Sequence, residues 1–182
     1  MGQNCTISIA VVRNTFWGTE NGVIIPNHCN QETGLYYQPD NINSSYLVGS
    51  QTRDGGWYCD CDFIKSNSRA IDTSKISMGA NDITISGKAD YRMNDWIVMY
   101  GAVSGRDMGQ IVEVNARMEF DGNWFYDLYK IRHIDFTDGD SGAPIIGMSG
   151  NSHKYAGMNI GVHEGYNYGH DWTFLKYKLG LR

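Results

Sequence analysis

Residues 139–144 read Gly-Asp-Ser-Gly-Ala-Pro, so Ser141 stands between small residues in a segment that favours a sharp turn. The glycines let the backbone bend tightly and bring its N–H groups beside the hydroxyl. N–H groups placed in this way can stabilise the negative oxygen of a tetrahedral intermediate. The leading hypothesis is acyl-transfer chemistry with Ser141 as the nucleophile, and the alternative is an ordinary turn.

A histidine and an aspartate earlier in the chain have the surroundings that such a serine needs. His28 follows residues 22–26, an apolar and β-branched run that predicts a strand delivering the imidazole to a loop. Asp60 stands at the start of the apolar segment 60–64, where its carboxylate can be held firmly. In this arrangement the histidine accepts and later returns the serine proton, while the aspartate fixes the orientation of the imidazole.

The order His28, Asp60, Ser141 resembles that of the chymotrypsin-fold serine proteases, in particular their compact microbial branch of α-lytic protease and streptogrisin type. Shorter segments are similar in the same order, at residues 5–7, 36–39, 104–111 and 160–165. The resemblance covers most of the chain. It implies an all-β fold of two six-stranded antiparallel Greek-key barrels, with the active site in the cleft between them and a short C-terminal helix.

The resemblance also implies roles for individual residues. The main-chain N–H groups of Gly139 and Ser141 would form the oxyanion hole. A disulfide would join Cys29, directly after the histidine, to Cys5 on the preceding strand. Such a bridge closes a loop of about 25 residues, which is worth on the order of 3 kcal/mol in the chain-entropy model and would anchor the histidine.

Residues 59–62 leave two questions open. Asp62 places a second acid where the resembled family has a small residue, so either carboxylate is a candidate, and Asp60 is preferred. Cys59 and Cys61 flank Asp60, and their state is left open, with a buried free thiol favoured for Cys61. The alternative is a zinc site that combines this Cys-x-Cys pair with His28 and Cys29, although its spacing is unusual. No metal or other cofactor is expected.

The residues expected to bind substrate suggest two different cleavage specificities. By resemblance, residues 160–165 form the strand beside the substrate, with Gly161 and Gly165 in it, and His163 would contact a Glu or Gln side chain before the cut. Asp135, six residues before the serine, instead occupies the position of the carboxylate that attracts Lys or Arg in the trypsin branch. The expectation is therefore a polar substrate side chain, with its identity open.

Composition and patterning indicate a single all-β unit of 182 residues, in which 22 glycines and only 3 prolines separate short apolar runs. Strands are predicted at residues 6–12, 22–26, 35–38, 57–64, 83–86, 96–100, 110–114, 125–134, 143–148 and 155–163. Residues 1–70 would form the N-terminal barrel, 82–171 the C-terminal barrel and 172–182 a closing helix, with the polar residues 65–81 as the connection.

The charge pattern excludes some partners. The net charge is −5 and the 15 basic residues are scattered, which argues against nucleic acid or an anionic membrane as the main partner. The longest apolar runs are about five residues, far below the roughly 20 that cross a bilayer. These patterns predict a soluble protein. The resemblance implies a monomer that acts on peptides or proteins and is secreted as a mature fragment rather than intracellular or viral. The alternatives are a protease-fold binding module without activity and a viral-type polyprotein-processing protease.

Overall fold

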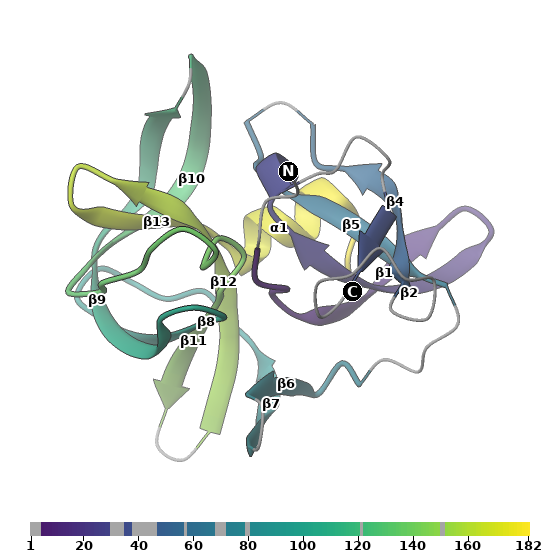
Figure 1. Ribbon diagram of the computed structural model, residues 1–182, viewed down its shortest axis with the longest axis horizontal. Coiled ribbons are helices and arrows are strands. Elements are labelled where there is room, and N and C mark those ends of the chain that lie inside the picture. Colours follow the sequence, from purple (N-terminus) through teal and green to yellow (C-terminus); the bar gives the residue numbers. More distant parts are fainter. Residues whose placement is uncertain are drawn as a thin grey trace.

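The computed structural model describes residues 5–29, 35–37, 47–56, 58–67, 72–78, 81–120, 122–149 and 152–182. Two β-rich bodies lie side by side (Figure 1). The first contains β1 (Ala10–Thr15), β2 (Gly18–Ile25), the short helical turn η1 (Asn27–Cys29), β3 (Leu35–Tyr37), β4 (Leu47–Asp54) and β5 (Asp62–Ser66). The second contains β6 (Lys75–Met78), β7 (Asn81–Lys88), β8 (Trp96–Gly101), β9 (Gly105–Phe120), β10 (Asn123–Arg132), β11 (Pro144–Ser149), β12 (Ser152–His163), β13 (Tyr166–Asp171) and the helix α1 (Trp172–Leu179).

The described strands pair into two sheets. The first sheet has the order β1-β2-β5-β4-β3, with antiparallel pairs. In the second sheet the order β11-β8-β9-β10-β13-β12 is closed by an additional β11–β12 pairing, which makes a six-stranded barrel. The β6–β7 hairpin joins this barrel through a parallel pairing of β7 with β12. The predicted all-β, two-barrel architecture is therefore confirmed, with five strands in the first sheet over the described residues.

The strand predictions missed three elements and misplaced others. β4, β6 and β13 were not predicted, and β6 lies in the stretch interpreted as a connection. β13 has the sequence Tyr-Asn-Tyr-Gly-His-Asp, which lacks β-branched residues, and it is a strand because barrel closure pairs it on both edges. Residues 57–61 were expected to open a strand, but β5 begins only at Asp62.

The largest buried cluster crosses between the two barrels. It includes Ile24 and Phe63 from the first sheet, Tyr155 from the second and Leu175 from α1. Within it the hydroxyl groups of Ser8 and Tyr155 lie 2.8 Å apart. Burial of shared apolar surface stabilises the two barrels against each other.

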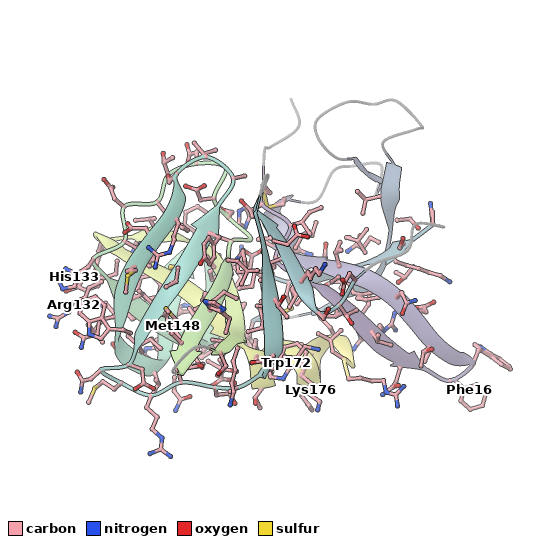
Figure 2. All side chains as sticks on the ribbon, turned by 90° about the horizontal axis from the view of Figure 1, so that it is seen from below. Phe16, Arg132, His133, Met148, Trp172 and Lys176 are labelled. Carbon is pink, nitrogen blue, oxygen red and sulfur yellow. A yellow bond between two sulfur atoms is a disulfide. The ribbon has the colours of Figure 1, made fainter. Side chains whose placement is uncertain are left out.

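Helix α1 packs beneath the junction of the barrels, where Figure 2 shows Trp172 and Lys176. The Asp171 side chain caps its first turn by accepting a hydrogen bond from the N–H of Phe174, and Gly180 ends it with a φ of 69°. Trp172, Leu175 and Leu179 lie on its buried face. Among the described residues, no helix has the length and apolar character to cross a membrane.

Candidate active site

His28 lies on η1, directly after the buried end of β2. Pro26 cannot donate to a β-ladder, so the strand stops there, and its carbonyl accepts a hydrogen bond from the N–H of Cys29 at 3.2 Å. Cys29 is joined to Cys5 by a disulfide. The chain around His28 is thus anchored, while 36% of the His28 side chain remains exposed at the cleft.

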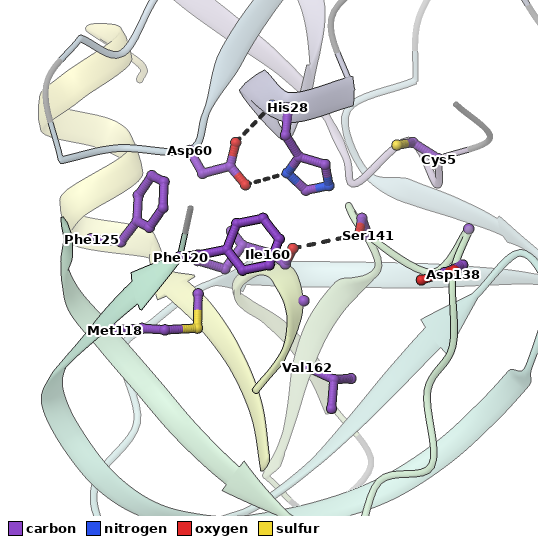
Figure 3. Close-up of a pocket in the computed structure, with 12 residues that line it drawn as sticks. Cys5, His28, Asp60, Met118, Phe120, Phe125, Asp138, Ser141, Ile160 and Val162 are labelled. Carbon is purple, nitrogen blue, oxygen red and sulfur yellow. Dashed lines mark hydrogen bonds and ion pairs between the residues drawn. The ribbon is translucent and has the colours of Figure 1, made fainter. Parts of the chain in front are cut away.

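Asp60 is 5% exposed and contacts His28 twice. Its Oδ1 accepts the main-chain N–H of His28 at 2.8 Å, and its Oδ2 lies 2.5 Å from His28 Nδ1. Burial by itself lowers the pKa of His28, but the hydrogen bond and the charge of Asp60 outweigh it, so this pKa is raised above 6.5. The carboxylate therefore holds the ring by Nδ1 and leaves Nε2 directed toward the cleft (Figure 3).

Asp62 faces a different partner. It is fully buried, and its Oδ1 accepts a hydrogen bond from Asn27 Nδ2 at 2.9 Å. Burial raises the pKa of Asp62 to about 6, against the opposing effect of the Asn27 hydrogen bond. Of the two candidate carboxylates, the one that contacts the His28 imidazole is Asp60.

Ser141 lies in a tight turn whose backbone conformation requires glycine at two neighbouring positions. Gly139 and Gly142 have φ of 99° and 93°, in the region that disfavours other residues. The Ser141 hydroxyl donates to the carbonyl of Ile160 at 3.4 Å and is not bonded to His28 (Figure 3). In the described part of the chain the N–H groups of Gly139 and Ser141 donate no hydrogen bond, so both are available to a ligand.

Asp140, between these two residues, holds the turn in place. Its side chain is fully buried and accepts hydrogen bonds from the N–H of Val103 at 2.9 Å, the N–H and hydroxyl of Ser104, and the N–H of Thr137 at 3.1 Å. Burial raises the pKa of Asp140, but these hydrogen bonds, with Ser104 first among them, outweigh it and lower the pKa overall. The carboxylate is therefore a structural anchor of the turn.

Thr6 fastens the same turn from the other side. Its N–H donates to the Ser141 carbonyl at 2.7 Å, and its hydroxyl donates to the Gly139 carbonyl at 3.0 Å. The hydroxyl also accepts the N–H of Ala102 at 3.0 Å. A Cβ at Gly142 would lie 1.8 Å from the Thr6 carbonyl oxygen, so this close approach requires glycine.

These groups meet at one cavity of about 640 Å³ between the barrels. His28, Asp60, Gly139 and Ser141 all line it, and the β9–β10 hairpin supplies an apolar wall (Figure 3). That wall consists of Met118, Phe120 and Phe125. A second cavity of about 610 Å³ shares His28, Asp60, Phe120 and Phe125, so the cleft continues along the hairpin.

The residues predicted to bind substrate separate into two groups. Gly161 lines the cavity, whereas His163, Asp135 and Gly165 are not among its lining residues. Asp135 is exposed, and its N–H donates to Asp107, while His163 Nε2 lies 3.9 Å from Glu164. The lining of the cavity therefore gives no support to a substrate-binding role for these three residues, and that role stays a prediction.

Several cavity residues were missed by the sequence analysis. Asp138, next to the predicted oxyanion turn, lines the cavity on the Ser141 side. The apolar wall was missed because β9 is a 16-residue strand whose exposed positions carry no catalytic signal. His170 was missed as well. It does not line the cavity, but it is fully buried and accepts the main-chain N–H of Asp60 at 3.0 Å.

The free thiol favoured at Cys61 was wrong, because Cys59 and Cys61 form a disulfide with each other. No cysteine of the chain is free. Donor atoms of Cys5, His28 and Cys29 do lie within 4.8 Å of one another, but both sulfurs belong to the Cys5–Cys29 bridge. In this oxidised state the chain has no thiolate to offer zinc, so the alternative zinc site is not formed.

No protein-family model matches the chain, and no curated protein matches its sequence significantly. Solved structures match over nearly its full length. A glutamic acid specific serine protease described as using a histidine triad in substrate binding has a TM-score of 0.78 at 15% identity, covering 97% of this chain and 91% of its own. Cellulomonas bogoriensis chymotrypsin has a TM-score of 0.77 at 17% identity, covering 98% and 90%.

The chain has the chymotrypsin fold. Nocardiopsis protease is similar as well, with a TM-score of 0.72 at 18% identity over 100% of this chain and 93% of its own. The predicted resemblance to the microbial branch of the chymotrypsin fold is therefore confirmed for the architecture. At such identities the likeness concerns the fold alone, and the chemistry has to be argued from the side chains.

Proposed function

We propose that the protein is a serine endopeptidase in which Ser141 attacks the peptide carbonyl, His28 is the general base and Asp60 orients it. The observation that carries this proposal is the convergence of His28, Asp60, Ser141 and two unpaired N–H groups on one cavity. In the first step the Ser141 hydroxyl proton moves to His28 Nε2 as Oγ bonds to the carbonyl carbon. The N–H groups of Gly139 and Ser141 receive the resulting oxyanion.

Collapse of the tetrahedral intermediate breaks the C–N bond, and His28 returns the proton to the leaving amine. Water then attacks the acyl-enzyme by the same route and releases Ser141. To begin this sequence the Ser141 hydroxyl must leave the Ile160 carbonyl and turn toward Nε2, and a rotation about a side-chain bond is fast.

The edge of β12 beside the cavity supports binding of an extended chain. Its pairing with β11 ends at Met158, and the main chain of Asn159 still bonds to Gly142 and Ala143. Beyond this point Ile160, Gly161 and Val162 line the cavity. A peptide can add to such a free strand edge through main-chain hydrogen bonds, which suits cleavage within a polypeptide.

The two disulfides support an oxidising location, and we propose that the enzyme acts outside the cell. Location does not alter the proposed chemistry, so a viral-type processing protease would use the same residues. A binding module without activity is the other candidate, and the hydrogen bond of Ser141 to Ile160 rather than to His28 is the observation in its favour.

Labelling with an organophosphonate separates the enzyme from the module, because phosphonylation needs an activated serine. We expect the wild-type protein to be labelled on Ser141 and to cleave peptides, and His28→Ala to be labelled far more slowly. Ser141→Ala should fold normally and lose about 10⁴- to 10⁶-fold in turnover, since triad members act as a unit. Folded wild-type protein that neither reacts nor cleaves would make the module the correct assignment.

A further inference from the structure

His170 is a fully buried histidine attached directly to the main chain of Asp60. Its Nε2 accepts the Asp60 N–H at 3.0 Å, across 110 residues of sequence. The ring stacks on Phe174 of α1, with centroids 4.8 Å apart and planes 26° apart. The strand that carries it, β13, is paired with Met158 of β12 and Leu128 of β10 at this residue. The position of Nε2 is therefore fixed by the second barrel and its helix.

The contact defines the protonation of the ring. A main-chain N–H can only donate, so Nε2 must keep its lone pair and the neutral ring must carry its proton on Nδ1. Burial lowers the pKa of His170 to about 4, while the charge of Asp60 and the main chain of Tyr126 oppose this and Lys178 adds to it. The ring thus remains a hydrogen-bond acceptor throughout the pH range in which a neutral His28 can act as a base.

The contact also joins the two halves of the proposed triad. Asp60 and His28 belong to the first barrel, and Ser141 belongs to the second. Both hydrogen bonds of the Asp60 carboxylate among the described residues go to His28, within its own barrel. The main-chain bond to His170 instead ties Asp60 to the barrel that carries the nucleophile.

We propose that His170 is a positioning residue, whose Nε2 fixes the Asp60 main chain and so sets the carboxylate and the imidazole against Ser141. This inference rests on the proposed protease function and adds to it a residue that does not touch the substrate. Displacement of a catalytic group by about 1 Å can cost on the order of 10²-fold in rate, so loss of the anchor should be visible in turnover.

The test compares two variants of similar volume, His170→Leu and His170→Gln. Leu removes the acceptor, whereas the Gln side-chain carbonyl can accept the Asp60 N–H in its place. We expect His170→Leu to lower kcat roughly ten- to hundredfold per active site, as counted by phosphonate titration, with a smaller change in KM. The acidic midpoint of its kcat/KM profile should also move down, because a displaced Asp60 raises the pKa of His28 less. His170→Gln should recover most of the rate and the original midpoint.

A purely structural role predicts something else. A preparation of His170→Leu would then contain a smaller fraction of active enzyme, but each active molecule would have the wild-type kcat and an unchanged pH midpoint. This result would overturn the inference. The matched control is His153→Leu. His153 lies near the start of β12, at the end away from the cavity-lining residues 160–162, and does not line the cavity. This variant should leave the kcat and the midpoint unchanged.

A measurement on the wild-type protein decides the matter if His170→Leu does not fold. ¹⁵N NMR of the histidine rings should show His170 protonated on Nδ1 and unprotonated on Nε2 at pH 5 to 8. Hydrogen exchange of the Asp60 amide should be slow. A proton on Nε2 would exclude the acceptor role. If the wild-type protein is inactive, the proposed function and this inference fall together, whereas an active wild type with an unaltered Leu variant removes the inference alone.

Discussion

The contact between His28 and Asp60 determines how the site should respond to pH. The base must be neutral, and the pKa of His28 is raised above 6.5 by Asp60 against the opposite effect of burial. We therefore predict that kcat/KM falls as the pH drops through a midpoint above 6.5. The ion pair contributes to stability in the opposite sense, fully below pH 6.5 and lost as the pH rises through the raised pKa. A pH–rate profile with a flat acidic side would exclude His28 as the base.

The two neighbouring aspartates should differ sharply in their effect on catalysis. Asp60→Asn removes the charge that stabilises the imidazolium, and we predict a loss of turnover on the order of 10⁴-fold. Asp62→Asn keeps an acceptor for Asn27 and places no change on the imidazole, so most of the activity should remain. Steady-state kinetics of both purified variants provide the comparison. A larger loss in Asp62→Asn would assign the orienting role to the other carboxylate.

Residues with a local signal could be predicted from sequence, and those with only a spatial role could not. Ser141 sits in a glycine turn, and His28 and Asp60 each adjoin an apolar run, so their types and surroundings indicated chemistry. His170 has no such signal, because its partner Asp60 is brought to it only by the packing of the two barrels. The state of Cys59 and Cys61 was also missed, since a pair two residues apart lacks the spacing of familiar disulfides.

At the scale of elements, the β9–β10 hairpin gives the cleft its apolar side. Its end also contacts the first barrel, where the rings of Tyr58 and Tyr126 meet edge to face at 4.9 Å. Only residues 110–114 of β9 were predicted as a strand, and nothing in the sequence indicated that the hairpin would extend past the barrel to the cleft. The polar substrate preference was inferred from Asp135 and His163 without knowledge of this wall.

The hairpin should therefore influence which peptides are cut. Phe120 lines both cavities and is 56% exposed, so Phe120→Ser should fold normally. We predict a 10- to 100-fold lower kcat/KM for peptides with apolar side chains before the cut, equivalent to about 1–3 kcal/mol of lost contact. Labelling by a small phosphonate should be unaffected. Peptide-library profiling of Phe120→Ser beside Glu119→Ser, whose side chain lies on the other face of the strand, supplies the measurement.

At the scale of the whole molecule, the catalytic groups depend on segments that cross between barrels. The all-β class followed from the short apolar runs and the two-barrel architecture from the resemblance, and both were confirmed. The relative placement of the barrels depends on the shared cluster of Ile24, Phe63, Tyr155 and Leu175. Such long-range packing has no periodic signature, which is why the shape of the cleft and its lining remained open at the sequence level.

The Cys5–Cys29 bridge should couple stability to activity. It closes a loop with a sequence separation of 24, and removing it by Cys5→Ser with Cys29→Ser should lower the free energy of unfolding by about 3 kcal/mol. Cys5 adjoins Thr6, which holds the Ser141 turn, and Cys29 adjoins His28, so turnover should also fall at temperatures where the variant is folded. Urea unfolding and kinetics on the same samples test both effects. Unchanged turnover in the folded variant would show that the bridge affects stability alone.

The position of Thr6 has a practical consequence for handling the protein. Cys5, which directly precedes Thr6, lines the cavity, and Thr6 holds the Ser141 turn. A bulky group placed directly before Cys5 would lie close to the cleft and to the residue that holds the Ser141 turn. Arg182 is exposed, and its main chain is tied to β1 rather than to the triad. Expression vectors should therefore carry the purification handle at the carboxyl end.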